Sequence, residues 1–355
     1  MIEASRFVLL LQGVPLVNEF IGSDTLPYIR KKPYAPTNLP FLLWFAILLL
    51  PLIASAQSDQ HYTMFMYNKL LYNPAYTGSR DVTSVNADYR DQWNNIDGAP
   101  KTANISIDAP VGSYMKTFRK VAVGFSLTNE TLGVENNTTF KAYYAYRIKF
   151  NQFILSLGLS GGGDLYSANY SKLHIYQPND PNFAANVSNN FLPNFGAGAY
   201  CYDDKSYISL SAPNMLQDAY DRKNDNVNNN IARQTRGIYL GGGHVFTLNE
   251  TFKLLPQILV RYASEDAYTL PVNCDFNVSA IFMDRFLLGA TYRTDKSVEA
   301  IVHIQATERL NVGYAYDYVI SALNGYTGGT HEIVLGYDIV KDNSKFLTPR
   351  FIKKF

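Results

Sequence analysis

The sequence predicts an all-β chain that forms a single antiparallel transmembrane β-barrel of about 14 strands, with a short helical segment ahead of the first strand. Three observations support this prediction. After residue 80 the chain divides into about fourteen segments of roughly ten residues in which apolar and polar side chains alternate, as they do in barrel strands. Charged residues are scarce while tyrosines are abundant, and the links between segments alternate between short and long. A bilayer admits only helices and closed barrels as spanning structures.

The segment 297–305 shows the alternation most clearly. The apolar side chains of Val298, Ala300, Val302 and Ile304 would point to one side of the strand. The polar side chains of Glu299, His303 and Gln305 would point to the other side, where Ile301 is the exception. The pattern alone fits two folds. A soluble sandwich turns its apolar face inward, whereas a barrel in lipid turns it outward and lines a wet interior with the polar face.

The same pattern places the expected strands along the chain. They are residues 82–92, 101–109, 120–129, 138–149, 152–162, 193–202, 206–212, 236–246, 252–262, 272–282, 285–293, 297–306, 309–319 and 330–339. No stretch after Gln57 approaches the ~18 continuous apolar residues of a membrane helix.

The composition favours the barrel and disfavours nucleic-acid binding. The 31 basic and 30 acidic residues nearly cancel, whereas a nucleic-acid-binding protein usually carries a basic excess. Only 17% of the residues are charged, and 14% are aromatic, including 27 tyrosines. Tyrosine enrichment suits the aromatic girdles at the two membrane edges. The alternative on composition is a tyrosine-rich secreted sandwich.

The lengths of the links decide between these folds. With the first strand starting in the periplasm, the even-numbered links are short, apart from 110–119, and the odd-numbered links include 163–192 and 213–235, the longest and most polar. Outer-membrane barrels have this asymmetry, with short periplasmic turns and long outer loops. A sandwich has no reason to sort its loops in this way. The low-complexity stretch 221–230 is therefore expected in an outer loop.

The N-terminal region predicts export. The apolar run 41–50 follows Arg30, Lys31 and Lys32 and precedes Ala54-Ser55-Ala56, which together form a secretory signal peptide cleaved before Gln57. The alternative, a membrane anchor, is disfavoured because the run is too short to span a bilayer. Residues 1–29 are either a misassigned start or an extension removed with the signal. The expected organisation is 1–56 extension and signal peptide, 57–80 periplasmic or plug segment, 81–340 barrel and 341–355 basic periplasmic tail.

No motif indicates an enzyme, a cofactor or a metal site. The chain lacks G-x-S-x-G and H-E-x-x-H, and its five histidines do not cluster at ligand spacing. Cys201 and Cys274 lie in separate strand segments and are expected to be buried or lipid-facing thiols. The glycine runs 161–163 and 241–243 resemble phosphate loops only superficially and suit barrel curvature or close packing of a plug.

The segment before the first strand predicts a short amphipathic helix. Met64, Tyr67, Leu70 and Leu71 have helical spacing, and Asn73-Pro74 ends the helix because proline disfavours helical backbone in the preceding residue. This helix would either plug the periplasmic mouth or be a merely ordered segment. Trp93 suits the outer membrane interface, and Gly98-Ala99-Pro100 indicates a turn.

Five short segments together resemble a known family. They contain Asn73, Pro74, Ala75 and Tyr76, then Gln92 and Trp93, then Gly98, Ala99 and Pro100, and finally His331 and Glu332, followed by Thr348-Pro349-Arg350-Phe351. The combination resembles the PorP/SprF family, outer-membrane components of the type IX secretion system and gliding machinery of Bacteroidota. The resemblance runs from about residue 58 to residue 351. His331 and Glu332 are expected to make a lumen or rim contact.

The resemblance implies a protein that assists secretion or surface retention of cargo, such as a gliding adhesin, or links the outer membrane to the periplasmic motor. Its partners would be the periplasmic and lipoprotein components of the system, the C-terminal domain of the cargo and outer-membrane lipid. The polar lining residues expected to make lumen or partner contacts are Arg147, Asp275, Asn277, Glu299 and His303. The alternative function is a passive porin or small-molecule transporter. The tail 341–355 either docks a periplasmic partner or is solvated.

Overall fold

The computed structural model describes residues 61–113, 120–173, 186–217, 234–265, 268–269 and 272–339. The predicted signal peptide and the basic tail 341–355 lie outside the described residues. Among the residues described, no helix is both long and apolar enough to cross a membrane.

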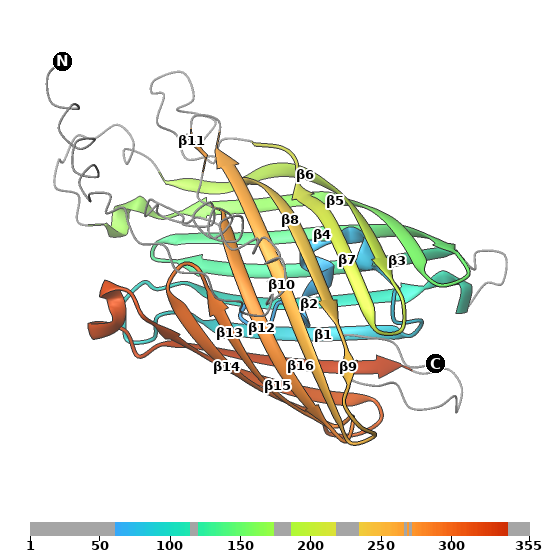
Figure 1. Ribbon diagram of the computed structural model, residues 1–355. Coiled ribbons are helices and arrows are strands. Elements are labelled where there is room, and N and C mark those ends of the chain that lie inside the picture. The colour runs from blue at the N-terminus through green and yellow to red at the C-terminus, as the bar shows by residue number, and fades with distance from the viewer. Residues whose placement is uncertain are drawn as a thin grey trace, which may run out of the picture. The chain divides into compact units, whose positions relative to one another are not determined.

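The described chain forms one closed antiparallel barrel of 14 long strands (Figure 1). The strands are β1 (Thr83–Asp91), β2 (Lys101–Pro110), β3 (Val121–Leu132), β4 (Glu135–Lys149), β5 (Ile154–Ala168), β6 (Val187–Tyr202), β7 (Ser206–Asn214), β8 (Arg236–His244), β10 (Phe252–Glu265), β12 (Asn273–Phe282), β13 (Phe286–Arg293), β14 (Ser297–Gln305), β15 (Leu310–Val319) and β16 (Thr330–Ile339). Two short strands, β9 (Phe246–Thr247) and β11 (Tyr268–Thr269), pair with β10. The barrel closes where β1 pairs with β16, from Thr83 opposite Ile339 to Asp91 opposite His331. The predicted fold class is confirmed.

Strands β3 to β6 are longer than the alternation predicts. β5 and β6 remain paired as far as Ala168 and Val187, so the expected link 163–192 is much shorter. The alternation in fact continues beyond the glycine run, since Asp164 and Tyr166 lie on one face and Leu165 on the other. The glycines of this run have no side chains, so they hide the continuation from a reading of the sequence.

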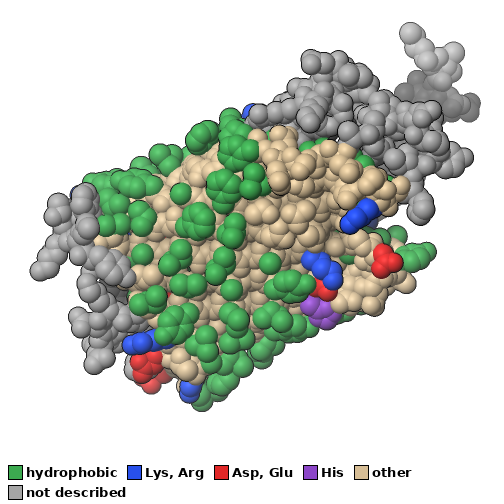
Figure 2. Space-filling view, turned by 180° about the vertical axis from the view of Figure 1, so that it is seen from behind, with side chains coloured by type: hydrophobic (Ala, Val, Ile, Leu, Met, Phe, Trp, Pro, Cys, Tyr) green, Lys and Arg blue, Asp and Glu red, His purple; other side chains and the backbone are tan. Residues whose placement is uncertain are grey.

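The apolar side chains face outward. In β14, Val302 is 43% exposed, whereas Glu299 and His303 are each 1% exposed. Figure 2 shows apolar side chains spread over the wall of the barrel, with charged ones toward its two ends. This arrangement fits a lipid environment. Ile301, the exception in the pattern, faces inward and is buried, and so are Leu255, Leu259, Ile281, Leu287 and Val334.

The two ends of the barrel differ in their links. The end at which β1 begins and β16 ends, here named the turn end, carries the short links 150–153, 203–205, 283–285 and 306–309, and the longer β2–β3 link with the 3₁₀ turn η2 (Val111–Ser113). The opposite end, here named the loop end, carries the two longest links, between β5 and β6 and between β7 and β8. The loop-end links also contain the 3₁₀ turns η4 (Tyr170–Lys172) and η6 (Ala322–Gly325). The predicted sorting of the links is therefore confirmed in the strand topology.

Residues 61–80, here named the plug, lie inside the barrel (Figure 1). The plug contains the helix α2 (Lys69–Tyr72) and the 3₁₀ turn η1 (Pro74–Tyr76), so the predicted helix from Met64 is wrong in its extent. The carbonyl of Tyr67 accepts a hydrogen bond from the side chain of Asn86 on β1, 3.2 Å away. Hydrogen bonds with the wall thus occupy backbone groups of the plug that would pair with each other in a continuous helix.

Candidate functional site

The plug runs through the barrel from the loop end to the turn end. Near the loop end, the backbone N–H groups of Thr63 and Met64 donate to the carboxylate of Glu332 on β16. Near the turn end, the N–H of Gly78 donates to Asp108 on β2 (2.8 Å), and Arg80 forms an ion pair with Asp338 (2.6 Å). The plug is therefore fixed to the wall at both of its ends.

The middle of the plug packs against apolar side chains from most of the wall. One cluster joins Tyr62, Met64, Phe65, Met66, Tyr67 and Tyr72 to Tyr239, Val245, Leu255, Leu259, Ile281, Leu287, Ile301, Ala315 and Val334. A second cluster joins Leu70, Ala75 and Tyr76 to Tyr143, Tyr200, Tyr202 and Tyr207. These contacts explain the inward apolar residues that break the alternation. The plug therefore packs inside the barrel against β4, β6 to β8, β10 and β12 to β16.

Buried charged side chains form a continuous network around the loop-end part of the plug. We name this network the ion-pair belt; it contains Arg90, Arg261, Asp275, Arg293, Glu299, Asp317 and Glu332. Its members come in turn from β10, β12, β13, β14, β15, β16 and β1, which are neighbours in the barrel. Arg293 lies at its centre, 2.9 Å from Asp275 and 2.8 Å from Glu299. A buried charge without an oppositely charged partner destabilises the folded state strongly. Removing one member of the belt would therefore leave its partners in that unfavourable state.

Glu332 connects the ion-pair belt to the plug. Its two carboxylate oxygens accept from the N–H of Thr63 at 2.6 Å and from the N–H of Met64 at 2.9 Å. The guanidinium of Arg90 lies 3.4 Å from the same carboxylate. Glu332 is completely buried. One side chain therefore satisfies two backbone donors of the plug and one buried cation of the wall.

The segment Asn73–Tyr76 turns the plug toward the first strand. The side chain of Asn73 accepts from the N–H of Ala75 at 2.9 Å and donates to the carbonyl of Ala199 on β6 at 3.0 Å. The wall opposite has no side chains: a Cβ at Gly158 would lie 2.2 Å from the nitrogen of Ala75, and one at Gly198 would lie 2.1 Å from Oδ1 of Asn73. Only glycine at these two positions allows the segment to approach so closely.

Lys69 is a buried cation on the plug helix. Its ammonium lies 3.7 Å from the centre of the Tyr207 ring and 5.8 Å from that of Tyr76, and no hydrogen-bond partner for it occurs among the residues described. Burial lowers the pKa of Lys69 to about 7. The contacts with the two rings compensate only part of the lost hydration.

Replacing Lys69 by methionine is expected to stabilise the folded protein at neutral pH by about 1–3 kcal/mol, because the variant buries no poorly compensated ammonium.

The unmodified protein should also gain stability as the pH rises from about 7 toward 10.5, the ordinary pKa of lysine, since only the unfolded chain holds the proton in that range. Below about 7 both states hold it and the contribution is constant. Denaturant unfolding in detergent across this pH range measures both effects, and equal pH slopes for the two proteins would contradict them.

The predicted contact residues lie mostly inside the barrel. Asp275 and Glu299 are members of the ion-pair belt. The ring of His303 stacks on Tyr67 of the plug at 4.3 Å, and Asn277 is buried on β12. Arg147 lies apart at the turn end, where it donates to the carbonyl of Gly78 at 2.7 Å. The structure thus brings four of the five predicted contact residues to the interior, and Arg147 holds the part of the plug nearest the turn end.

Several important residues were missed from the sequence: Arg90, Arg261, Arg293, Asp317 and Lys69. The first four lie at inward positions of their strands, so the alternation that selected Glu299 could have selected them too. Lys69 gave no such signal, because its burial depends on tertiary packing alone.

Three of the motif segments, 92–93, 98–100 and 331–332, lie close together at the loop end, whereas 73–76 lies in the plug. The N–H of Trp93 donates to the hydroxyl of Thr330 at 3.2 Å, and the N–H of Asn94 donates to the carbonyl of Gly329 at 2.8 Å. The N–H of Gln92 donates to the carbonyl of Pro100 at 3.0 Å, and the carbonyl of Gly98 accepts from Gly133 at 2.8 Å. The link 92–100 is therefore tied to the start of β16, beside the place where Glu332 holds the plug.

The two residues of the motif His331-Glu332 face opposite sides of the wall. Glu332 points into the barrel, whereas Nδ1 of His331 lies 2.7 Å from the hydroxyl of Tyr314 on the outer side. Exposed aromatic side chains also gather on the outer surface near both ends. Tyr89, Tyr262, Tyr292, Tyr314 and Tyr318 lie toward the loop end, and Phe150, Phe153, Phe246, Phe282 and Phe286 toward the turn end.

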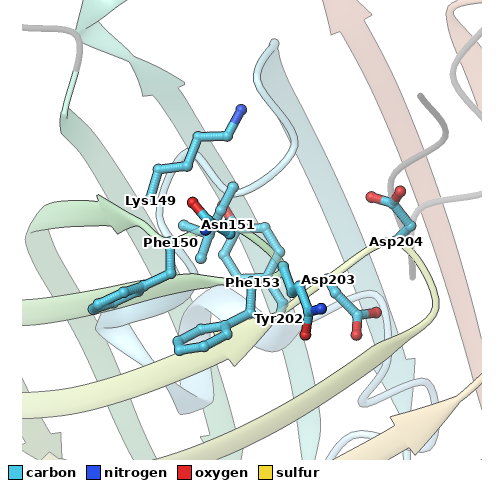
Figure 3. Close-up of a pocket in the computed structure, with 9 residues that line it drawn as sticks. Lys149, Phe150, Asn151, Phe153, Tyr202, Asp203 and Asp204 are labelled. Carbon is cyan, nitrogen blue, oxygen red and sulfur yellow. The ribbon is translucent and has the colours of Figure 1, made fainter.

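A groove of about 200 Å³ opens at the turn end (Figure 3). It lies between the β4–β5 turn, where the rings of Phe150 and Phe153 stack with centres 4.6 Å apart, and the β6–β7 turn, which supplies Asp203 and Asp204. One side of the groove is therefore aromatic and the other acidic. Unlike the interior, this surface is accessible to another molecule.

Within the part of the chain that the structure describes, no three histidine, cysteine or acidic side chains are grouped so that they could hold a metal ion. Cys201 and Cys274 are free thiols and half-buried, and they are not joined to each other.

A family model described as type IX secretion system membrane protein PorP/SprF matches residues 54–337. The chain belongs to the PorP/SprF family. The match covers the plug and the barrel except the last two residues of β16, so the family resemblance is confirmed; the segment 348–351 lies outside the match. Among curated proteins, none matches the chain.

Solved outer-membrane proteins resemble the chain only distantly. The outer membrane protein Omp33 of Acinetobacter baumannii aligns over 74% of this chain and 100% of its own, with a TM-score of 0.42 and 7% identity. The NanC porin aligns over 73% of this chain and 99% of its own, with a TM-score of 0.36 and 11% identity. The KdgM porin aligns over 72% and 99%, with a TM-score of 0.33 and 11% identity.

Proposed function

We propose that this PorP/SprF protein is a plugged outer-membrane barrel that docks partner proteins of the type IX secretion system. The observation that carries the proposal is the plug, which packs inside the barrel against side chains from most of its long strands. Family membership supports a role in type IX secretion, and the apolar outer wall supports a place in the membrane. The turn end would then face the periplasm and the loop end the cell surface.

The plug disfavours the alternative of a passive porin. A porin needs a continuous aqueous path, and its interior is lined by solvated polar groups. Here seven inward charged residues pair with one another in the ion-pair belt, and inward leucine and isoleucine side chains pack on the plug. A solute could pass only after the plug had moved.

The arrangement suggests separate docking surfaces for separate partners. The groove beside Phe150 and Asp203 opens at the turn end, where periplasmic or lipoprotein components of the system would meet it. The C-terminal domain of a cargo protein would meet the loop end. Asp275, Asn277, Glu299 and His303 remain proposed cargo contacts, but the plug covers them, so cargo would reach them only by displacing it.

Purification from native membranes in mild detergent, followed by mass spectrometry, tests the proposed function. We expect a secreted protein carrying a type IX C-terminal domain, or a periplasmic lipoprotein of the system, to co-purify in fixed proportion. An abundant unrelated barrel from the same membranes is the control. If the protein purifies alone and makes liposomes permeable to sugars, the porin function replaces the docking function.

A further inference from the structure

The groove at the turn end lies on the rim of the barrel, between the aromatic outer surface and the plug. It has a volume of about 200 Å³ and is lined by residues 149–154 and 202–204 (Figure 3). Two of the lining side chains, Ile154 and Tyr202, also pack in the second apolar cluster, which contains part of the plug. The groove therefore reaches the inner side of the rim, where the barrel mouth opens to water.

One side of the groove presents two phenylalanine rings in a fixed arrangement. Phe150 and Phe153 are 45% and 41% exposed, and their stacked rings are inclined by 23°. The N–H of Phe150 donates to the carbonyl of Phe153 at 2.9 Å, which closes the turn that carries both rings. The face of an aromatic ring attracts a cation, and a planar guanidinium can also stack on it.

The other side of the groove presents two carboxylates. Oδ1 of Asp203 accepts from the N–H groups of Lys205 and Ser206, both at 2.7 Å, so this carboxylate is held in place by its own turn. Asp204 is exposed and makes no hydrogen bond or ion pair with any residue that the structure describes. Lys149 lies with the phenylalanines on the opposite side (Figure 3). Two carboxylates and one ammonium leave the lining with a formal charge of −1.

We infer that the groove binds an arginine side chain of the periplasmic partner, whose guanidinium stacks on the phenylalanine rings and pairs with Asp203 and Asp204. The inference rests on the proposed function, which places the turn end in the periplasm. Arginine fits better than lysine, because its planar group can stack on a ring and donate to two carboxylates at once. The groove suits one extended side chain, whereas a helix is about 10 Å wide.

A lipid headgroup with an ammonium group would also complement the charge of the groove. Its acyl chains, however, hold a lipid on the outer side of the wall. Ile154 and Tyr202 lie on the inner side, where they contact the plug. The lining as a whole therefore favours a water-exposed polypeptide over a lipid.

Photocrosslinking in intact cells tests which molecule occupies the groove. Asn151 is exposed and lines the groove, so the variant Asn151→p-benzoylphenylalanine places the reactive group there. After irradiation and digestion, mass spectrometry identifies the attached segment. We expect a segment of a periplasmic type IX component that contains an arginine. A segment without arginine, or an adduct with lipid, would overturn the inference.

Charge reversal tests the same contact without a crosslinker. With Asp204→Lys, we expect the recovery of the crosslinked component from native membranes to fall about tenfold, since a like charge replaces the pairing carboxylate. Phe153→Leu, which keeps an apolar side chain but removes the ring, should also reduce the recovery. Glu250→Lys makes the same change of charge in an exposed turn at the same end and should leave the recovery unchanged.

The inference and the proposed function fail in different ways. If the component co-purifies equally with the unmodified protein and with Asp204→Lys, the groove does not bind it, although the docking function stands. If no type IX component co-purifies with the unmodified protein, the docking function itself fails. Replacing the crosslinked arginine by glutamate in the partner should restore the recovery with Asp204→Lys, and no restoration would contradict the pairing.

Discussion

Replacing Glu332 by alanine is expected to lower the free energy of unfolding by about 3–5 kcal/mol, as breaking a buried ion pair generally does. The variant leaves the N–H groups of Thr63 and Met64 without their acceptor and removes a carboxylate 3.4 Å from Arg90. The part of the plug nearest the loop end should therefore detach from the wall first. Denaturant unfolding in detergent measures the loss, and hydrogen exchange should show faster exchange in residues 61–67 than in β1.

Glu250→Ala provides the matched control for this prediction. Glu250 lies exposed in the turn between β9 and β10, so its removal should change the stability by less than about 0.5 kcal/mol. If Glu332→Ala were no more harmful than Glu250→Ala, or if exchange in residues 61–67 did not change, Glu332 would not hold the plug.

Replacing Gly158 by alanine is expected to displace the plug from the opposite side. The new methyl group would lie 2.2 Å from the nitrogen of Ala75 and 2.3 Å from the carbonyl carbon of Pro74, both of which are backbone atoms. Backbone cannot yield as a flexible side chain does, so the cost should be at least the ~1–3 kcal/mol typical of overpacking. Thermal unfolding measured by the electrophoretic shift of folded barrels, together with proteolysis of the plug, measures this effect.

Gly161→Ala is the matched control on the same strand. Its added methyl group would have only the ring of Phe195 nearby, at 3.6 Å, and it would lie on the outer face. This variant should keep the plug protected and unfold close to the temperature of the unmodified protein. Equal loss of protection in both variants would mean that glycine in β5 matters for the strand itself and not for the plug.

The strands were predictable because the bilayer and the closed wall impose a period of two on the side chains. The alternation in 297–305 and 309–319 gave both the strands and the outward faces, since each polar residue had to avoid lipid. The extra length of β5 was not predictable, because glycine carries no side chain to show a face.

The ion-pair belt and the role of Glu332 depended on information that local patterns lack. Arg90 and Glu332 are far apart in the sequence, and only the closure of β1 on β16 makes them opposite neighbours. Likewise Ile301 interrupts the polar face of β14, and nothing local shows that it packs on a plug. The family resemblance marked Glu332 as a motif residue, but its contact with the backbone of Thr63 appeared only in the structure.

We infer that residues 61–80 close the barrel, and ion conductance in planar bilayers measures whether they do. The mature protein should show no stepwise ion conductance, whereas a variant lacking residues 57–76 should show discrete open steps, because its polar inner wall would then enclose water. Stable open steps of the same size in both proteins would contradict the claim.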